Sequence, residues 1–147
     1  MRWIMTEFDL RQFLPYQLAA AAERVSRDFA ETYRREFGIS IPEWRVLAHL
    51  AQEDEVSVRD IESRVGMEKS KVSRAVSRLE MAGYVAKRIN ADDRRLLSLS
   101  LTPEGTALMQ RLIPIALAYQ DDLTARLGVD AAALSSALRT IVQREKP

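Results

Sequence analysis

Apolar residues recur at helical spacing towards both ends of the chain. Near the start they lie four or seven positions apart, at Leu14, Leu18, Val25, Phe29, Tyr33 and Phe37. This spacing predicts a long first helix within residues 9–37, opened by Asp9 and closed by Gly38. Alternatively, Pro15 gives this helix a kink or a later beginning. A second stripe runs along Leu108, Leu112, Ile115, Tyr119 and Leu123. A third stripe follows Asp130, so helices are expected within residues 102–146.

Three shorter helices are predicted between these stripes. Ile41-Pro42 opens one helix, because proline is favoured in a first helical turn. Ser57 is expected to cap a short helix that ends at Gly66. The segment KSKVSRAVSRLE, residues 69–80, forms the third. Helix, loop, short helix, turn and helix is the order of a helix-turn-helix unit.

The period changes from helical to alternating after Gly83. Leu97, Leu99 and Leu101 alternate with serines, and a second short run covers residues 85–89. NADDRR, residues 90–95, lies between them and predicts a turn. We therefore expect a mainly α fold with a small two-stranded β wing. The chain, residues 1–147, is predicted to be one domain, with a winged helix-turn-helix lobe at about 39–101 and dimerisation helices at 9–37 and 102–146.

Composition excludes several functional classes. The 147 residues include no cysteine and one histidine, His49, which argues against thiol chemistry and a histidine metal site. We find no glycine-rich phosphate loop, metal-ligand cluster or nucleophile with a paired base, so neither an enzyme nor a cofactor is expected. Residues 1–10 lack the apolar core of a signal peptide, and no apolar run is long enough for a bilayer. The expected location is cytoplasmic, with no membrane partner.

Positive charge is concentrated in one part of the chain. The net charge is +1, yet residues 69–95 contain eight Lys or Arg and three acids, a local net charge of +5. The remaining residues therefore carry −4. Such a block is expected either to face a polyanion or to form a solvated surface with a few ion pairs.

The arrangement of residues 69–80 favours a polyanion. At 100° per residue, the buried stripe of this helix is Val72, Val76 and Leu79, and small hydroxyls and cations lie opposite. A merely solvated helix would more often alternate Glu with Lys. Small residues allow close approach to DNA, and cations attract phosphates or bind guanine. The residues expected to face DNA here are Lys69, Ser70, Lys71, Ser73, Arg74, Ser77 and Arg78.

The wing tip carries Arg94 and Arg95. A hairpin beside a recognition helix can place arginines in the minor groove, whose negative potential attracts guanidinium. The alternative is a solvated hairpin in which Asp92 and Asp93 pair with the two arginines.

Four segments together resemble the MarR family of winged-helix transcription regulators. They are PEWRVLAHL (residues 42–50), SVRDIESRVGMEKSKVSRAVSRLEMAGYVAKR (57–88), DRR (93–95) and LTPEG (101–105). The resemblance implies a homodimer on double-stranded DNA, with residues 69–81 in the major groove and Arg94 or Arg95 in the minor groove. It also implies that Asp93 braces an arginine of the lobe, either Arg74 or Arg78. Asn90-Ala91 departs from the Asp-Pro that many members have.

The resemblance further implies a small aromatic or anionic effector, bound between the dimer helices and the DNA lobe. Its expected lining residues are Phe13, Tyr16, Trp44, Arg45 and His49. Alternatively, Tyr16 and Trp44 are core or interface aromatics and His49 is a helix-surface residue. The predicted function is a homodimeric, sequence-specific repressor of a palindromic operator, released by such a ligand. The alternative is a winged-helix interaction module that binds a protein, or nucleic acid without sequence preference.

Overall fold

The first long helix begins at Leu14, the first residue of its apolar stripe, and not directly after Asp9. In the computed structural model, which describes residues 7–143, α2 spans Leu14–Phe37 and ends at Gly38 with φ 68°. Asp9 accepts a hydrogen bond from the N–H of Arg11 and caps a short 3₁₀ turn, η1 (Leu10–Gln12). Pro15 lies in the first turn of α2, where its missing N–H has no consequence. The expectation that Asp9 opens this helix is therefore wrong.

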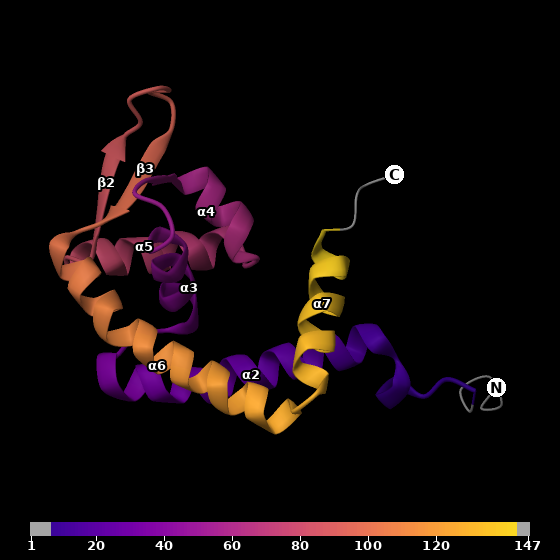
Figure 1. The fold of residues 1–147 in the computed structure, drawn as a ribbon. Helices are drawn as coiled ribbons and strands as arrows, with labels where there is room; N and C mark the ends of the chain where they lie inside the picture. Colours follow the sequence, from indigo (N-terminus) through magenta and orange to yellow (C-terminus); the bar gives the residue numbers. More distant parts are fainter. Residues whose placement is uncertain (1–6, 144–147) are drawn as a thin grey trace. The chain divides into compact units, whose positions relative to one another are not determined.

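The helix-turn-helix unit forms as its capping residues predict. It consists of α3 (Ile41–Leu50), α4 (Val58–Val65) and α5 (Lys69–Met81). The hydroxyls of Ser40 and Ser57 accept the N–H groups of Glu43 and Asp60, which satisfies one free donor at the start of each helix. Helix α3 packs against both α4 and α5 (Figure 1). Their shared core contains Val46, Leu47, Leu50, Ile61, Val65, Val72, Ala75, Val76 and Leu79.

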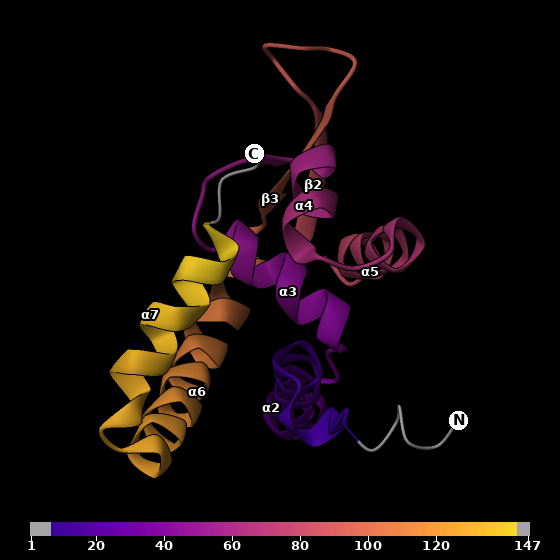
Figure 2. The same cartoon turned by 90° about the vertical axis from the view of Figure 1, so that its right-hand side faces the viewer.

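The wing is an antiparallel hairpin of β2 (Val85–Ile89) and β3 (Leu97–Leu101), as predicted. A third strand, β1 (Val56–Ser57), pairs with the other side of β3 and gives the order β1-β3-β2. The expected wing thus lies within a three-stranded sheet. Strand β1 escaped prediction because two residues cannot show an alternating pattern. The hairpin turn extends beyond α4 and α5 (Figure 2).

The junction between α5, the wing and the next helix depends on Gly105. The N–H of Thr102 donates to the carbonyl of Tyr84 at 3.0 Å, and its hydroxyl donates to the carbonyl of Gly83. The same hydroxyl accepts the N–H of Gly105. A Cβ atom at residue 105 would lie 2.0 Å from the carbonyl oxygen of Tyr84. Only glycine allows this contact, which links Tyr84 to the LTPEG segment, residues 101–105.

Two compact units divide the chain, one up to Met109 and one from Gln110. The boundary falls within α6 (Pro103–Leu127), and α7 (Asp130–Val142) completes the second unit. Both helices lie within the predicted range 102–146, of which residues 144–146 are outside the described part. Large apolar side chains of the second unit are exposed, at Ile113, Leu117, Val129, Leu134, Leu138, Ile141 and Val142. No helix within residues 7–143 is long and apolar enough to cross a membrane.

Candidate nucleic-acid interface

Helix α5 separates into a buried face and an outward polar face. Val72, Ala75, Val76 and Leu79 are at most 2% exposed and hold the helix on the lobe. All of the residues predicted to face DNA are exposed, namely Lys69, Ser70, Lys71, Ser73, Arg74, Ser77 and Arg78. The apolar spacing therefore gave the correct orientation of α5. Their contact with DNA stays a prediction.

The cations on this face differ in their partners. Lys69 lies 3.9 Å from Glu62, at the limit of an ion pair. Lys71 and Arg74 form no ion pair with any charged group in residues 7–143. Arg78 pairs with Glu43, whose Oε1 accepts its Nε–H at 3.1 Å. The surface thus combines unpaired cations with one arginine that is held in place.

Glu43 was not among the predicted site residues. It lies in the first turn of α3, and its side chain is only 14% exposed. The Ser40 hydroxyl donates to the same Oε1 at 2.8 Å. The sequence shows the local Ser40-x-x-Glu43 capping pattern, but it does not show a contact with Arg78, 35 residues away. Glu43 therefore connects the start of α3 to the outward side of α5.

Asn90 and Asp93 build the wing turn. The Asn90 Oδ1 accepts the N–H groups of Asp92 and Asp93, and its Nδ2 donates to the Ser98 hydroxyl. Asp93 Oδ1 accepts both the N–H and the Nε–H of Arg95, at 3.0 and 3.1 Å, and Oδ2 accepts Nη2 at 3.2 Å. These hydrogen bonds from Arg95 lower the pKa of the Asp93 carboxyl. Asn90 thus shapes a turn in which Asp-Pro is absent.

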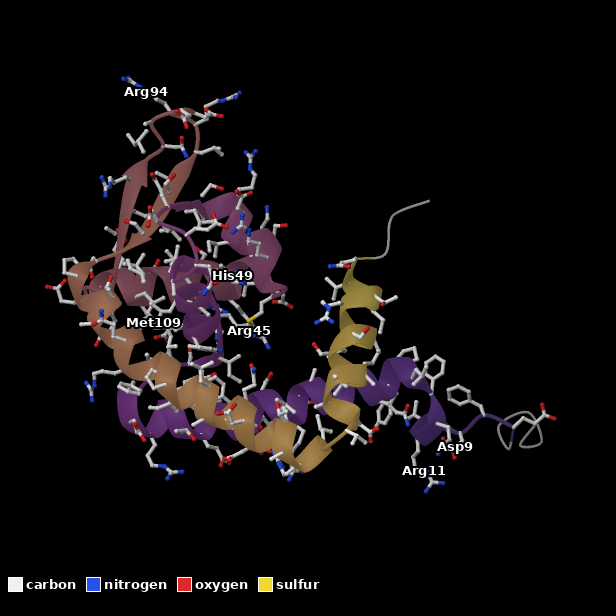
Figure 3. The ribbon with its side chains drawn as sticks, viewed as in Figure 1. Asp9, Arg11, Arg45, His49, Arg94 and Met109 are labelled. Carbon is white, nitrogen blue, oxygen red and sulfur yellow. The ribbon has the colours of Figure 1, made fainter. Side chains whose placement is uncertain are left out.

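The expected brace from Asp93 to Arg74 or Arg78 is wrong for this chain. Asp93 pairs with Arg95, two residues away, because a guanidinium can fold back onto a turn carboxylate at that spacing. The pair of Asp93 with Arg95 is one of the ion pairs that the solvated-hairpin alternative expected. Arg94, however, forms no ion pair with the charged groups of residues 7–143 and lies at the wing tip (Figure 3).

The expected ligand residues fall into two separate groups. Trp44 packs edge-to-face on Phe29, with ring centroids 5.1 Å apart, and stacks on Tyr33 at 5.9 Å. Burial raises the pKa of Tyr33 to about 12. Trp44 thus belongs to the packing between α2 and α3, as the alternative interpretation held. Arg45 and His49 lie on the same helix, α3 (Figure 3).

The neighbours of Arg45 and His49 come from different elements. Arg45 Nη2 donates to the Ser26 hydroxyl at 3.4 Å, so this half-buried cation contacts α2. Burial lowers the pKa of His49, and the nearby Arg64 lowers it further. Burial and Arg64 thus favour the neutral imidazole, whereas the guanidinium of Arg45 offers a full positive charge to an anion.

Phe13 and Tyr16 lie at the far end of α2. The Phe13 ring packs on Phe8, with centroids 5.3 Å apart. A helix rises about 1.5 Å per residue, so Tyr16 is separated from Phe29 by about 20 Å along α2. One chain therefore does not bring Phe13 and Tyr16 together with Trp44.

Comparison with known proteins identifies the lobe. A family model described as MarR family matches residues 37–96. The crystal structure of the MarR family transcriptional regulator SPO1453 from Silicibacter pomeroyi DSS-3 is 32% identical and superposes with a TM-score of 0.80. The alignment covers 92% of this chain and 96% of that one. The chain belongs to the MarR family. The predicted family and the winged helix-turn-helix fold are confirmed.

Other relatives agree with this assignment. The transcriptional regulator PapX of Escherichia coli is 27% identical over 84% of this chain and 76% of its own length. The transcriptional repressor MdtR of Bacillus subtilis is 28% identical, over 65% of this chain and 61% of its own. BpsR of Bordetella bronchiseptica, whose DNA binding is regulated by 6-hydroxynicotinic acid, shares the fold with a TM-score of 0.81, 21% identity and coverage of 94% and 99%. As a MarR regulator, the chain is a DNA-binding transcription regulator rather than an enzyme.

Proposed function

We propose that this chain is a homodimeric repressor of a palindromic operator, and that a small aromatic or anionic ligand releases it from DNA. The observation that carries the proposal is the division of α5, whose apolar face is buried while its serine and cation face is exposed. A helix built this way enters a major groove without exposing core residues. Its cations attract phosphates, and its small residues allow the backbone to come close.

The proposed contacts follow from this orientation. In the major groove they are Lys69, Ser70, Lys71, Ser73, Arg74, Ser77 and Arg78. The wing supplies Arg94 and Arg95 to the adjacent minor groove, where a narrow groove concentrates negative potential. Asp93 then holds the Arg95 guanidinium at the turn through hydrogen bonds, and it makes no ion pair with Arg74 or Arg78 within residues 7–143.

A second copy of the chain is the proposed partner of the terminal helices. Exposed apolar side chains occur on α2, α6 and α7, and include Leu14, Leu117 and Leu138. A two-fold dimer would bury the same patch on both copies and repeat the recognition helix on the other half of a palindrome. Half-sites about 34–36 Å apart would then be read together.

A site for the proposed ligand is suggested by the side chains that α3 carries. Arg45 offers a cation, and His49 offers a hydrogen-bond donor or acceptor. Trp44 packs on Phe29 and Tyr33 but is only partly buried, so its exposed part could form an aromatic wall. Phe13 and Tyr16 lie too far along α2 to join them within one chain, so they would line a site only across the dimer. The 6-hydroxynicotinic acid that regulates BpsR is both aromatic and acidic, which fits these residues.

Selection of duplexes from a random pool tests the proposal. After several rounds, the bound fraction is expected to converge on a palindrome with two half-sites. A screen of small aromatic acids against that palindrome then tests release. Recovery of a random pool with unchanged composition would contradict the proposal and favour the alternative, an interaction module without sequence preference.

A further inference from the structure

We infer that the two arginines of the recognition helix have different tasks: Arg74 reads a base edge, while Arg78, positioned by Glu43, contacts a phosphate. This inference rests on the proposed function, because it assumes that α5 enters a major groove. It assigns base specificity to Arg74, a phosphate contact to Arg78 and a positioning role to Glu43.

Position around α5 is the first argument. Arg74 lies opposite the buried stripe and between two small residues, Ser70 and Ser77. Arg78 is four residues further along, which rotates it by about 40° towards the lobe. The centre of a helix in the major groove faces base edges, whereas its sides face the phosphates that line the groove. Arg74 thus has the central place and Arg78 a flanking one.

The partners of the two side chains are the second argument. Arg74 is exposed, and its guanidinium has neither a hydrogen bond nor an ion pair within residues 7–143. All of its donors remain available for a bidentate pair with guanine O6 and N7. Arg78 has already given its Nε–H to Glu43, although 54% of its side chain is exposed. Its two terminal nitrogens remain to meet a phosphate.

The environment of Glu43 is the third argument. A carboxylate close to a DNA-facing surface repels phosphates unless a cation offsets its charge. Glu43 is largely buried, and the Ser40 hydroxyl and the Arg78 guanidinium both donate to its Oε1. This pair neutralises Glu43 and fixes the direction of Arg78. The ion pair joins α3 to α5, so it also helps to fix the position of that side of α5 on the lobe.

The first experiment compares Arg74→Ala with Arg78→Ala on the selected palindrome and on each of its single-base variants. Arg74→Ala is expected to reduce discrimination by about 5- to 150-fold at one base pair of each half-site. Arg78→Ala is expected to weaken binding to all variants alike. It should also lower the slope of log K against log salt by about 1 for each half-site.

A double-mutant cycle tests Glu43. Glu43→Ala removes a negative charge in any background, but it releases a positioned arginine only where Arg78 is present. Its effects on affinity in the wild type and in Arg78→Ala are therefore expected to differ by about 2-fold or more. Ser57→Ala is the matched control, because it removes the cap of a neighbouring helix of the same lobe, α4, and leaves Ser40, Glu43 and Arg78 in place. It should lower the melting temperature and leave base preference and salt slope unchanged.

The outcomes separate the two levels of the proposal. Equal effects of Glu43→Ala in both backgrounds would remove its positioning role. A base preference that changes in Arg78→Ala, or uniform weakening in Arg74→Ala, would overturn the assignment of the arginines while sequence-specific binding stands. A wild-type protein without any sequence preference would overturn the proposed function as well as this inference.

Discussion

Asn90, Asp93 and Arg95 determine the wing turn through hydrogen bonds over two or three residues. The Asn90 amide holds the backbone of the turn, and the Asp93 carboxylate holds both the backbone and the side chain of Arg95. Short polar side chains favour such local bonds, which is why turns are rich in Asn and Asp. At the residue scale, the wing therefore has one arginine that is restrained and another, Arg94, that forms no ion pair with residues 7–143.

Acid is expected to release Arg95 from Asp93. Hydrogen bonds from Arg95 lower the folded pKa of Asp93 below its usual value of 3.8. A carboxyl with a lowered pKa contributes stability above the usual value and loses it as the pH falls through the lowered one. The Nε–H resonance of Arg95, followed by NMR, should stay constant from pH 7 to about 4 and move below that. Asp93→Asn is the control, and its Arg95 resonance should show no such step.

A movement of the Arg95 resonance near pH 6 in the wild type would contradict this account of the turn. It would mean that a different group, and not Asp93, controls the wing arginine.

At the scale of elements, the sequence predicted the helices and strands that are marked by capping residues or by an alternating pattern within the element itself. Ser57 and Gly66 marked the ends of α4, and the alternation of Leu97, Leu99 and Leu101 gave β3 its bounds. The sequence offered two starts for α2, one at the capping pattern of Asp9 and a later one at Pro15, and the structure has the later one. The pairing of β1 with β3 and the contact of Glu43 with Arg78 join residues far apart in sequence, so no local pattern revealed them.

The ligand residues illustrate the same limit. Aromatic and cationic residues at positions 13, 16, 44, 45 and 49 share a chemistry, but sequence alone does not give the distances between them. The structure uses Trp44 in packing with Phe29 and Tyr33 and leaves Phe13 at the other end of α2.

Gly105→Ala is expected to destabilise the junction between β2 and α6. The added methyl group would lie 2.0 Å from the carbonyl oxygen of Tyr84, so the backbone must move. Overpacking of this kind typically costs about 1–3 kcal/mol. Urea unfolding measures the loss in the free energy of unfolding. Thr106→Ala, at an exposed position of the same helix, is the control and should stay within about 0.5 kcal/mol of the wild type. Equal stabilities of the two variants would mean that the close contact is absent.

At the scale of the whole molecule, a single chain buries the apolar core of the lobe, but large apolar side chains of α2, α6 and α7 remain exposed. Phe8, Leu14, Leu117 and Leu138 are each more than 40% exposed, and Val142 reaches 83%. Exposed large apolar groups in this number mark an interaction surface. The proposed homodimer accounts for them and gives the molecule two recognition helices related by a two-fold axis, which is what a palindrome requires.

The central claim is that the exposed face of α5, held by the buried one, reads a DNA sequence. The most direct test is a fluorescence anisotropy titration of the selected palindrome and a scrambled duplex of equal length, at one salt concentration. The palindrome is expected to bind at least about 10³-fold more tightly. Arg74→Ala should reduce this ratio with α5 still folded by circular dichroism. Equal affinities of the wild type for the two duplexes would contradict the account.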